Sequence, residues 1–278
     1  MELSELRQKP HLSASTITTY IDCSLQYYFS RVKRLPMEFV ADALSFGTVI
    51  HLVLAEFYRS KMAGDRLLLK DIHELYRQFW TREAKDRSEI KYAEGKDFNT
   101  YLMEGVDLLT VWFNKLPDDN FNVVAIEEAF VFEIDGIPIP IIGAIDLVEE
   151  DESGAIIITD FKTSSRAYSI DEIDQNPQVT IYQMAAKANG FADREILLKF
   201  DCLVKTKTPK FERYYTTRTE IDELRLIRIM QRVWEGINKA VFIPHPSWKC
   251  PNCQYRKACD EWFLKGDAND QASVKPSR

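Results

Sequence analysis

Residues 122–163 read NVVAIEEAFVFEIDGIPIPIIGAIDLVEEDESGAIIITDFKT, and this segment decides the fold. Two runs rich in β-branched and aromatic residues, 122–134 and 137–149, flank the dipeptide Asp135-Gly136, which is a strong signal for a tight hairpin turn. A second turn, DESG, leads into 155–163, whose consecutive isoleucines are typical of a buried central strand. The segment therefore predicts three antiparallel strands that follow one another along the chain.

The segments before and after these strands have apolar residues at helical spacing. A helical region precedes them, and a helix, two strands that are expected to pair, and a long amphipathic helix follow. The spacing predicts helices over about 15–30, 43–62, 69–85, 98–116, 177–188 and 220–240, and strands over 195–204 and 211–217. The expected fold class is therefore α/β, with a mixed sheet flanked by helices.

The chain is expected to divide into four regions, which together form one compact unit. The first helix is expected to carry Cys23, and the second to carry His51. The regions are a helical part over 1–118, a core over 119–218, a C-terminal helix and cysteine-cluster segment over 219–265, and a disordered tail over 266–278.

The composition is that of a protein with a sizeable core, because 45% of its 278 residues are hydrophobic. A formal net charge of −7 argues weakly against nonspecific coating of nucleic acid, although it does not exclude a local basic groove. No apolar run is long enough to cross a bilayer, and the N-terminus has no signal-peptide stretch. We therefore expect a cytoplasmic protein without a membrane partner.

A pair of carboxylates and a lysine are the first candidates for chemistry. Asp160 and Lys162 are two apart on a predicted strand, so they leave the same face, while Phe161 points the other way. A tight turn before this strand pairs residues whose numbers sum to roughly 305, which places Asp146 opposite a position near Asp160. A Mg²⁺ or Mn²⁺ ion would relieve their repulsion. An ordinary strand end is the more common explanation of Asp-x-Lys alone, but its place after an apolar strand favours a site.

The order of the motifs resembles a known family. His51, Gly143 with Asp146, Asp160 with Lys162, and Gln178 with Tyr182 follow one another as in the RecB-type nucleases of the PD-(D/E)XK superfamily. Ile145 stands where the superfamily name has a proline, which the RecB-type subgroup tolerates. The resemblance spans nearly the whole chain and implies a restriction-endonuclease-like fold.

The resemblance also implies roles for these residues. Metal ligands would be His51, Asp146, Asp160 and the Phe161 backbone carbonyl, the catalytic lysine would be Lys162, and DNA would be bound by Gln178 and Tyr182. A lone histidine on an apolar helix is more often a core residue, so His51 has two explanations.

Five cysteines in a reducing compartment favour metal binding or buried thiols over disulfides. Cys250, Cys253 and Cys259 form a C-x₂-C-x₅-C pattern, and either Cys23 or Cys202 could supply a fourth thiolate. Cys202 lies in an apolar strand, so Cys23 is the better candidate. Zinc and a [4Fe-4S] cluster suit four thiolates about equally. The resemblance to AddB and the nucleases of CRISPR adaptation, with one early and three late cysteines, implies the iron-sulfur cluster.

These observations predict a Mg²⁺- or Mn²⁺-dependent DNA exonuclease that acts on single-stranded ends in repair, recombination or mobile-element processes. The alternative is a non-catalytic subunit that binds DNA ends within a helicase or integrase complex. Aromatic and basic residues are mixed over 27–34, either to stack bases and follow phosphates or as a buried face beside solvated charges.

Overall fold

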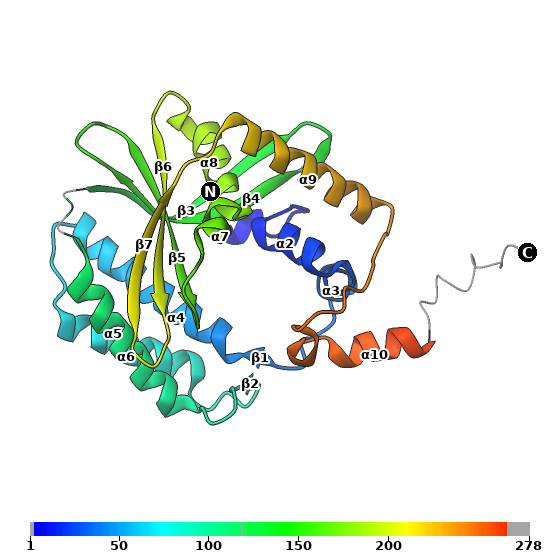
Figure 1. The fold of residues 1–278 in the computed structure, drawn as a ribbon, viewed down its shortest axis with the longest axis horizontal. Helices are drawn as coiled ribbons and strands as arrows, with labels where there is room; N and C mark the ends of the chain where they lie inside the picture. The colour runs from blue at the N-terminus through cyan, green and yellow to red at the C-terminus, as the bar shows by residue number, and fades with distance from the viewer. Residues whose placement is uncertain (1–2, 118, 120, 266–278) are drawn as a thin grey trace, which may run out of the picture.

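The predicted strands all occur in the computed structural model, which describes residues 3–117, 119 and 121–265 (Figure 1). They form one sheet in the order β3-β4-β5-β6-β7, in which β5 and β6 are parallel and the other neighbours are antiparallel. The mixed α/β sheet is therefore confirmed. The strands are β3 (Asn122–Ile134), β4 (Ile137–Glu150), β5 (Ile156–Ser164), β6 (Ile196–Val204) and β7 (Lys210–Thr216).

Three long helices cover one face of the sheet. They pack on it through a cluster that includes Phe46, Trp80 and Trp112 from the helices and Phe161 from β5. A short parallel pair, β1 (Val40–Ala41) and β2 (Ile90–Lys91), lies at their end. The helices are α4 (Asp42–Met62), α5 (Leu69–Ala84) and α6 (Phe98–Lys115), as the apolar spacing predicts.

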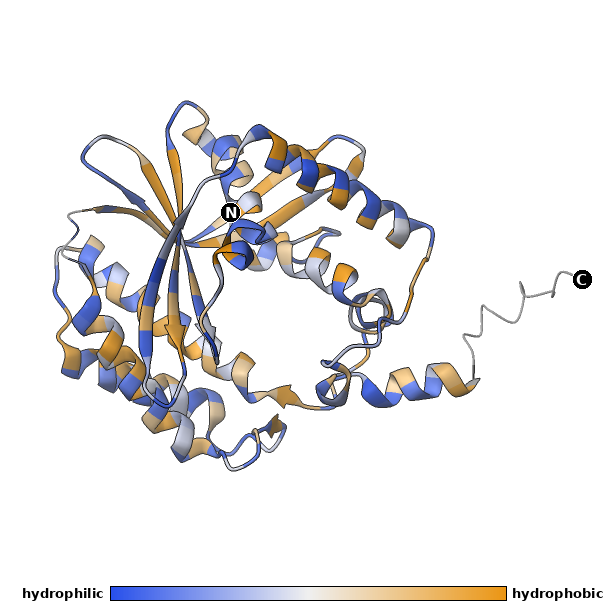
Figure 2. Cartoon of the chain, viewed as in Figure 1, coloured by the Kyte–Doolittle hydropathy of each residue, from blue (hydrophilic) through white to orange (hydrophobic). Residues whose placement is uncertain are grey.

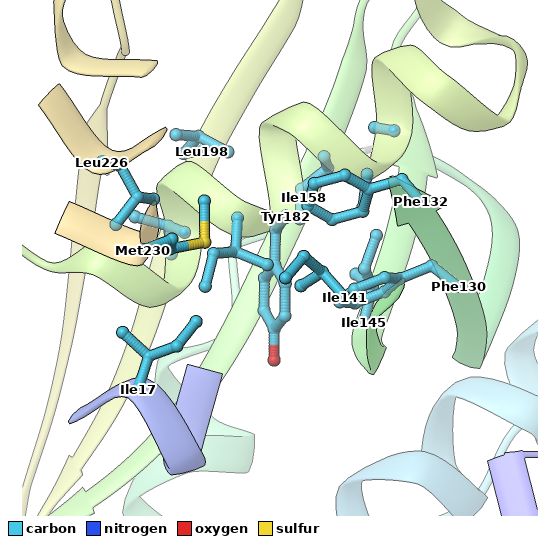
Figure 3. Packing of buried hydrophobic residues seen from close by; sticks show 14 of the residues in the cluster. Ile17, Phe130, Phe132, Ile141, Ile145, Ile158, Tyr182, Leu198, Leu226 and Met230 are labelled. Atoms are coloured by element: carbon cyan, nitrogen blue, oxygen red, sulfur yellow. The ribbon is translucent and has the colours of Figure 1, made fainter. Parts of the chain in front are cut away.

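The opposite face carries the second part of the core. Figure 3 shows Ile17, Tyr182, Leu226 and Met230 packed with apolar residues of the strands. Figure 2 shows α9 with alternating apolar and polar positions, as expected of a helix with one buried face. The elements here are α2 (Ala14–Asp22), α7 (Ile170–Asp174), α8 (Pro177–Ala186) with the π-helix η2 (Lys187–Phe191), and α9 (Glu220–Asn238).

The predicted first helix is wrong in one respect, because it does not run through Cys23. Cys23 is extended, with φ −162° and ψ 100°, and it separates α2 from α3 (Ser24–Tyr27). The Ser24 hydroxyl donates to the Ile243 carbonyl at 3.1 Å, and this contact with the distant C-terminal segment accompanies the break. A short α1 (Leu3–Leu6) precedes α2, and the π-helix η1 (Tyr28–Val32) follows α3.

The C-terminal segment returns to this break. Figure 1 shows the orange segment after α9 beside the blue α3, and the Tyr20 hydroxyl donates to the Val241 carbonyl at 2.6 Å. Lys249 Nζ pairs with Asp22 Oδ2 at 2.7 Å. The segment ends in η3 (Cys250–Asn252) and α10 (Arg256–Lys265). The predicted tail over 266–278 lies outside the described residues, among which no helix is long and apolar enough to cross a membrane.

Candidate active site

The ladder between β4 and β5 ends at the proposed catalytic residues. It runs from Glu150 opposite Ile156 to Leu147 opposite Thr159, so paired residue numbers sum to 306. The next position would place Asp146 opposite Asp160. At that position a side chain takes the place of a backbone carbonyl, because the Oδ2 atom of Asp146 accepts a hydrogen bond from the Phe161 N–H at 2.8 Å. The register expected from the sequence is therefore confirmed to within one residue, although the backbone pairing itself ends at Leu147 opposite Thr159.

The two strands separate beyond this point, which leaves part of β4 with an open edge. At its other end this edge is occupied again, since Leu12 forms a parallel bridge with Ile141 and accepts from the Ile142 N–H at 2.9 Å. Within the described residues, 143–146 therefore have no strand partner on that side. A side chain on Gly143 would meet the Phe130 ring at 2.5 Å, so close packing requires glycine there.

Asp160 is the most unusual carboxyl group of the site. It is fully buried, and Lys162 Nζ lies 2.7 Å from its Oδ2. Among the described residues its Oδ1 has no hydrogen-bond partner. Burial raises the pKa of the Asp160 carboxyl to about 6, and the Asp146 carboxylate adds to this shift while Lys162 opposes it. A buried carboxylate with an unsatisfied oxygen is a site for a cation.

Lys162 is held on the same face as Asp160, as predicted, by a chain of polar contacts. Its Nζ donates to Gln178 Oε1 at 2.8 Å, and Gln178 Nε2 donates to the Tyr182 hydroxyl at 2.6 Å. Burial disfavours the ammonium form, but the Asp160 carboxylate outweighs it and raises the pKa of Lys162. Burial raises the pKa of Tyr182 well above its usual range. The site therefore holds a fixed ammonium ion and a neutral phenol at neutral pH.

His51 reaches the same carboxylates from the opposite helix layer. Its Nδ1 lies 3.6 Å from Asp146 Oδ2, and its side chain is 34% exposed. Burial lowers its pKa, but the hydrogen bond and charge of Asp146 outweigh this, so the pKa of His51 is raised. Gly47, one turn earlier, brings α4 close to β5, since a Cβ there would lie 3.2 Å from the Thr163 hydroxyl. The structure thus places His51 at the site rather than deep in the core.

Glu127 is a site residue to which the sequence alone assigns no role. Its neighbours pair as Ile126 with Leu147 and Glu128 with Ile145, which places Glu127 opposite Asp146. Its φ of 51° is rare for a residue other than glycine in a strand. Glu127 forms an ion pair with Arg59 and lines a groove together with His51. The only signal in the sequence is a pair of adjacent glutamates, and alternation does not tell which one faces the site.

The donor set of this centre fits Mg²⁺ or Mn²⁺, since carboxylate oxygens and a backbone carbonyl are the ligands that these ions prefer, while an imidazole ligand suits Mn²⁺ better than Mg²⁺. The unsatisfied Asp160 Oδ1 supports the fit. Across residues 3–117, 119 and 121–265, however, no three His, Cys, Asp or Glu side chains already lie in an arrangement that would hold a metal ion. Asp146 uses Oδ2 to accept from the Phe161 N–H, so its Oδ1 atom is the one that would bind a metal ion.

The four cysteines selected from the sequence lie around one cavity of about 90 Å³. None of them is in a disulfide, and all four are partly buried. Burial raises the pKa of the Cys253 and Cys259 thiols, and the neighbouring thiols, including Cys23, add to the shift. By contrast, Cys202 is fully buried in β6, where burial raises its pKa to about 12. The fold therefore brings Cys23 to Cys250, Cys253 and Cys259 and keeps Cys202 apart in the core.

Comparison with known proteins agrees with this geometry. The sequence pattern of the PD-(D/E)XK nuclease superfamily matches residues 11–260. The chain belongs to the PD-(D/E)XK nuclease superfamily. A relative in Carboxydothermus hydrogenoformans, named as a subunit of an ATP-dependent helicase/deoxyribonuclease, is 27% identical over 201 residues, which cover 64% of this chain and 18% of the relative. The chain thus spans less than a fifth of that protein.

A solved structure shows the same fold for this PD-(D/E)XK protein. The crystal structure of a proposed exonuclease from Eubacterium rectale superposes with a TM-score of 0.52 at 12% identity, over 99% of this chain and 94% of the other. At this identity the likeness concerns the fold alone. The match covers the helices on both faces of the sheet as well as the strands, so the helical N-terminal region is part of the shared architecture.

Proposed function

We propose that this protein is a Mg²⁺- or Mn²⁺-dependent deoxyribonuclease with Asp146, Asp160 and Lys162 at its catalytic centre. The observation that carries the proposal is the buried Asp160, which has an unsatisfied oxygen and lies next to Lys162 where β4 and β5 separate. Membership of a nuclease superfamily and the deoxyribonuclease named among its relatives support it.

In this proposal the metal ion would be held by Asp146, Asp160, the Phe161 carbonyl and His51. Such an ion supplies Lewis-acid stabilisation of the phosphate and lowers the pKa of a bound water molecule. Lys162 has a raised pKa, so it acts as a fixed positive charge for the phosphate oxygens rather than as a base. Gln178 holds Lys162 in place through its Oε1 atom, and the second N–H of its Nε2 atom would donate to the DNA backbone.

The proposed substrate is the end of a DNA strand, preferably single-stranded, in repair, recombination or mobile-element processes. The proposed exonuclease that shares the fold and the helicase/deoxyribonuclease subunit among the relatives support this class of reaction. A helicase or an integrase is the kind of partner that would deliver such ends. If the protein binds DNA ends without cutting them, it is instead a non-catalytic subunit of such a complex.

The test uses DNA labelled at the 5′ or the 3′ end, single- and double-stranded, with Mg²⁺, Mn²⁺ or EDTA. Cleavage that needs a divalent ion and disappears in Asp160→Ala and Lys162→Ala would support the assignment. Asp193→Ala and Lys207→Ala remove the same charges from exposed positions and should cleave normally. Equal cleavage by all four variants would contradict it, and binding without cleavage by the wild type would favour the non-catalytic subunit.

The cysteine group has a separate proposed role. Cys23, Cys250, Cys253 and Cys259 would hold a [4Fe-4S] cluster, with zinc as the less favoured alternative. The cavity that all four cysteines line supports the proposal. The group would join the start of the chain to its C-terminal segment, since the two meet beside Ser24 and Ile243. Its function would be structural.

A further inference from the structure

A second cavity, of about 520 Å³, lies next to the proposed catalytic centre. One wall is formed by the N-terminal segment from Leu3 to Ser15, and another by β4 around Gly143. Gln178 and Tyr182 form part of its lining. Its volume falls in the range of about 300–1,000 Å³ that is usual for small-ligand sites in proteins.

The charge of this cavity is opposite to that of the chain. The chain has a net charge of −7, yet the lining contains Arg7, His11 and Arg31 and, within the described part of the chain, no Asp or Glu. Neither guanidinium has an ion-pair partner among the residues that the structure describes. Ser13 and Ser15 also line the cavity, but their hydroxyl groups hydrogen-bond to each other and the Ser13 hydroxyl caps α2, so the guanidinium groups are the main donors. Such a set of donors without acceptor charges fits the phosphate of an anionic ligand.

The N-terminal wall is fixed to the sheet. Leu12 is buried, and both of its backbone groups hydrogen-bond to β4. Its N–H donates to the Pro140 carbonyl at 3.0 Å, and its carbonyl accepts from the Ile142 N–H at 2.9 Å. The Nδ1 atom of His11 lies 2.7 Å from the Lys9 carbonyl, which orients the ring and leaves Nε2 for another contact. The wall that carries Arg7 and His11 is therefore anchored to β4 at Leu12.

The cavity is continuous with the catalytic centre. Gln178 lines the cavity and accepts the hydrogen bond from Lys162. Gly143 and Ala144, on the open edge of β4, also line it, and Asp146 follows two residues later. A strand whose phosphate lies at Lys162 would therefore have its neighbouring nucleotide at this cavity.

We propose that this cavity binds the nucleotide next to the phosphodiester that is cut, with Arg7 and Arg31 holding its phosphate. The inference rests on the proposed nuclease function and names residues for its substrate strand outside the catalytic motifs. Arg31 thereby gains a role within the mixed aromatic and basic stretch over 27–34. The aromatic residues of that stretch, Tyr27, Tyr28 and Phe29, are buried and serve the core instead.

The test measures the affinity for fluorescein-labelled oligothymidylate by anisotropy, in EDTA so that the strand is not cut. Arg7→Glu and Arg31→Glu should each weaken binding at least about tenfold, and each lost phosphate contact should reduce the slope of log affinity against log salt by about 0.7. Arg225→Glu removes an exposed arginine that does not line the cavity, so it should bind like the wild type. In the exonuclease assay, both cavity variants should raise KM and leave kcat within about twofold.

The outcomes separate the two proposals. If wild-type protein cuts DNA but the cavity variants bind and cut like Arg225→Glu, the cavity is not a nucleotide site and the nuclease assignment stands. If the wild type neither binds nor cuts any DNA, both proposals fail together. A loss of affinity that is the same in all three arginine variants would show a general charge effect and would also overturn the cavity proposal.

Discussion

Replacing Asp160 with asparagine should stabilise the protein when no metal is bound. Burial raises the pKa of this carboxyl from 3.8 to about 6, so the folded state holds its proton more tightly than the unfolded state. The folded state therefore loses stability as the pH rises from about 4 to about 6. A shift of about two pH units corresponds to about 3 kcal/mol, and full burial means that solvent screening does not reduce this estimate.

Urea unfolding in EDTA at a series of pH values measures this effect. At pH 7.5 Asp160→Asn should have a free energy of unfolding about 3 kcal/mol above that of the wild type, and the difference should disappear near pH 4. The exposed Asp193→Asn is the control and should show no such dependence. Mn²⁺ should raise the melting temperature of the wild type more than that of Asp160→Asn, because the variant lacks a charged ligand.

Two results would refute this reasoning. If Asp160→Asn is less stable than the wild type at every pH, the buried carboxylate contributes favourable interactions and is not a strained cation ligand. If Mn²⁺ stabilises the variant as much as the wild type, the ion binds without Asp160. Either result can be obtained without measuring nuclease activity, so it tests the metal site separately from the reaction.

Three further predictions concern the other site residues. Lys162→Ala should lower the rate of DNA cleavage by about 10²–10³-fold, whereas the exposed Lys207→Ala should leave it unchanged, and equal rates would remove Lys162 from the mechanism. His51→Ala should lower cleavage at least about tenfold with little change in melting temperature, since the side chain is one-third exposed, whereas strong destabilisation with retained activity would make it a core residue. Anaerobically purified protein should be brown and contain iron and sulfide, and Cys23→Ala should lose colour and stability together while Cys202→Ala keeps its colour. Colourless protein with stoichiometric zinc would show that the four cysteines bind zinc and not an iron-sulfur cluster.

The strands and their register could be predicted because their signals are local. The turn at Asp135-Gly136 and alternation of residue type fixed β3 and β4, and the second turn fixed the sum of paired residue numbers to within one. That register was enough to bring Asp146 and Asp160 together. Asp160 and Lys162 then share a face by the period of a strand, and Gln178 and Tyr182 by the period of a helix.

The remaining features depend on contacts between distant parts of the chain. The helix break at Cys23 accompanies contacts between Ser24 and Ile243, more than two hundred residues later, and the local pattern of residues 13–32 gives no sign of it. The cavity lined by Arg7 and Arg31 exists because Leu12 joins the edge of β4. Glu127 faces the site through a positive φ that alternation does not predict.

The place where β4 and β5 separate explains why residues of both helix layers form one site. A continuous sheet would keep α4 and α8 apart, because each layer contacts only its own face. The last pair of the ladder is Leu147 opposite Thr159, and just beyond it Asp146 lies close to His51 of α4. Asp160 on the next strand pairs with Lys162, and Gln178 on α8 accepts a hydrogen bond from that lysine. The same separation leaves the edge of β4 open toward the basic cavity. Substitutions that extended the ladder past Asp146 would therefore close the entrance to the site as well as displace its carboxylates.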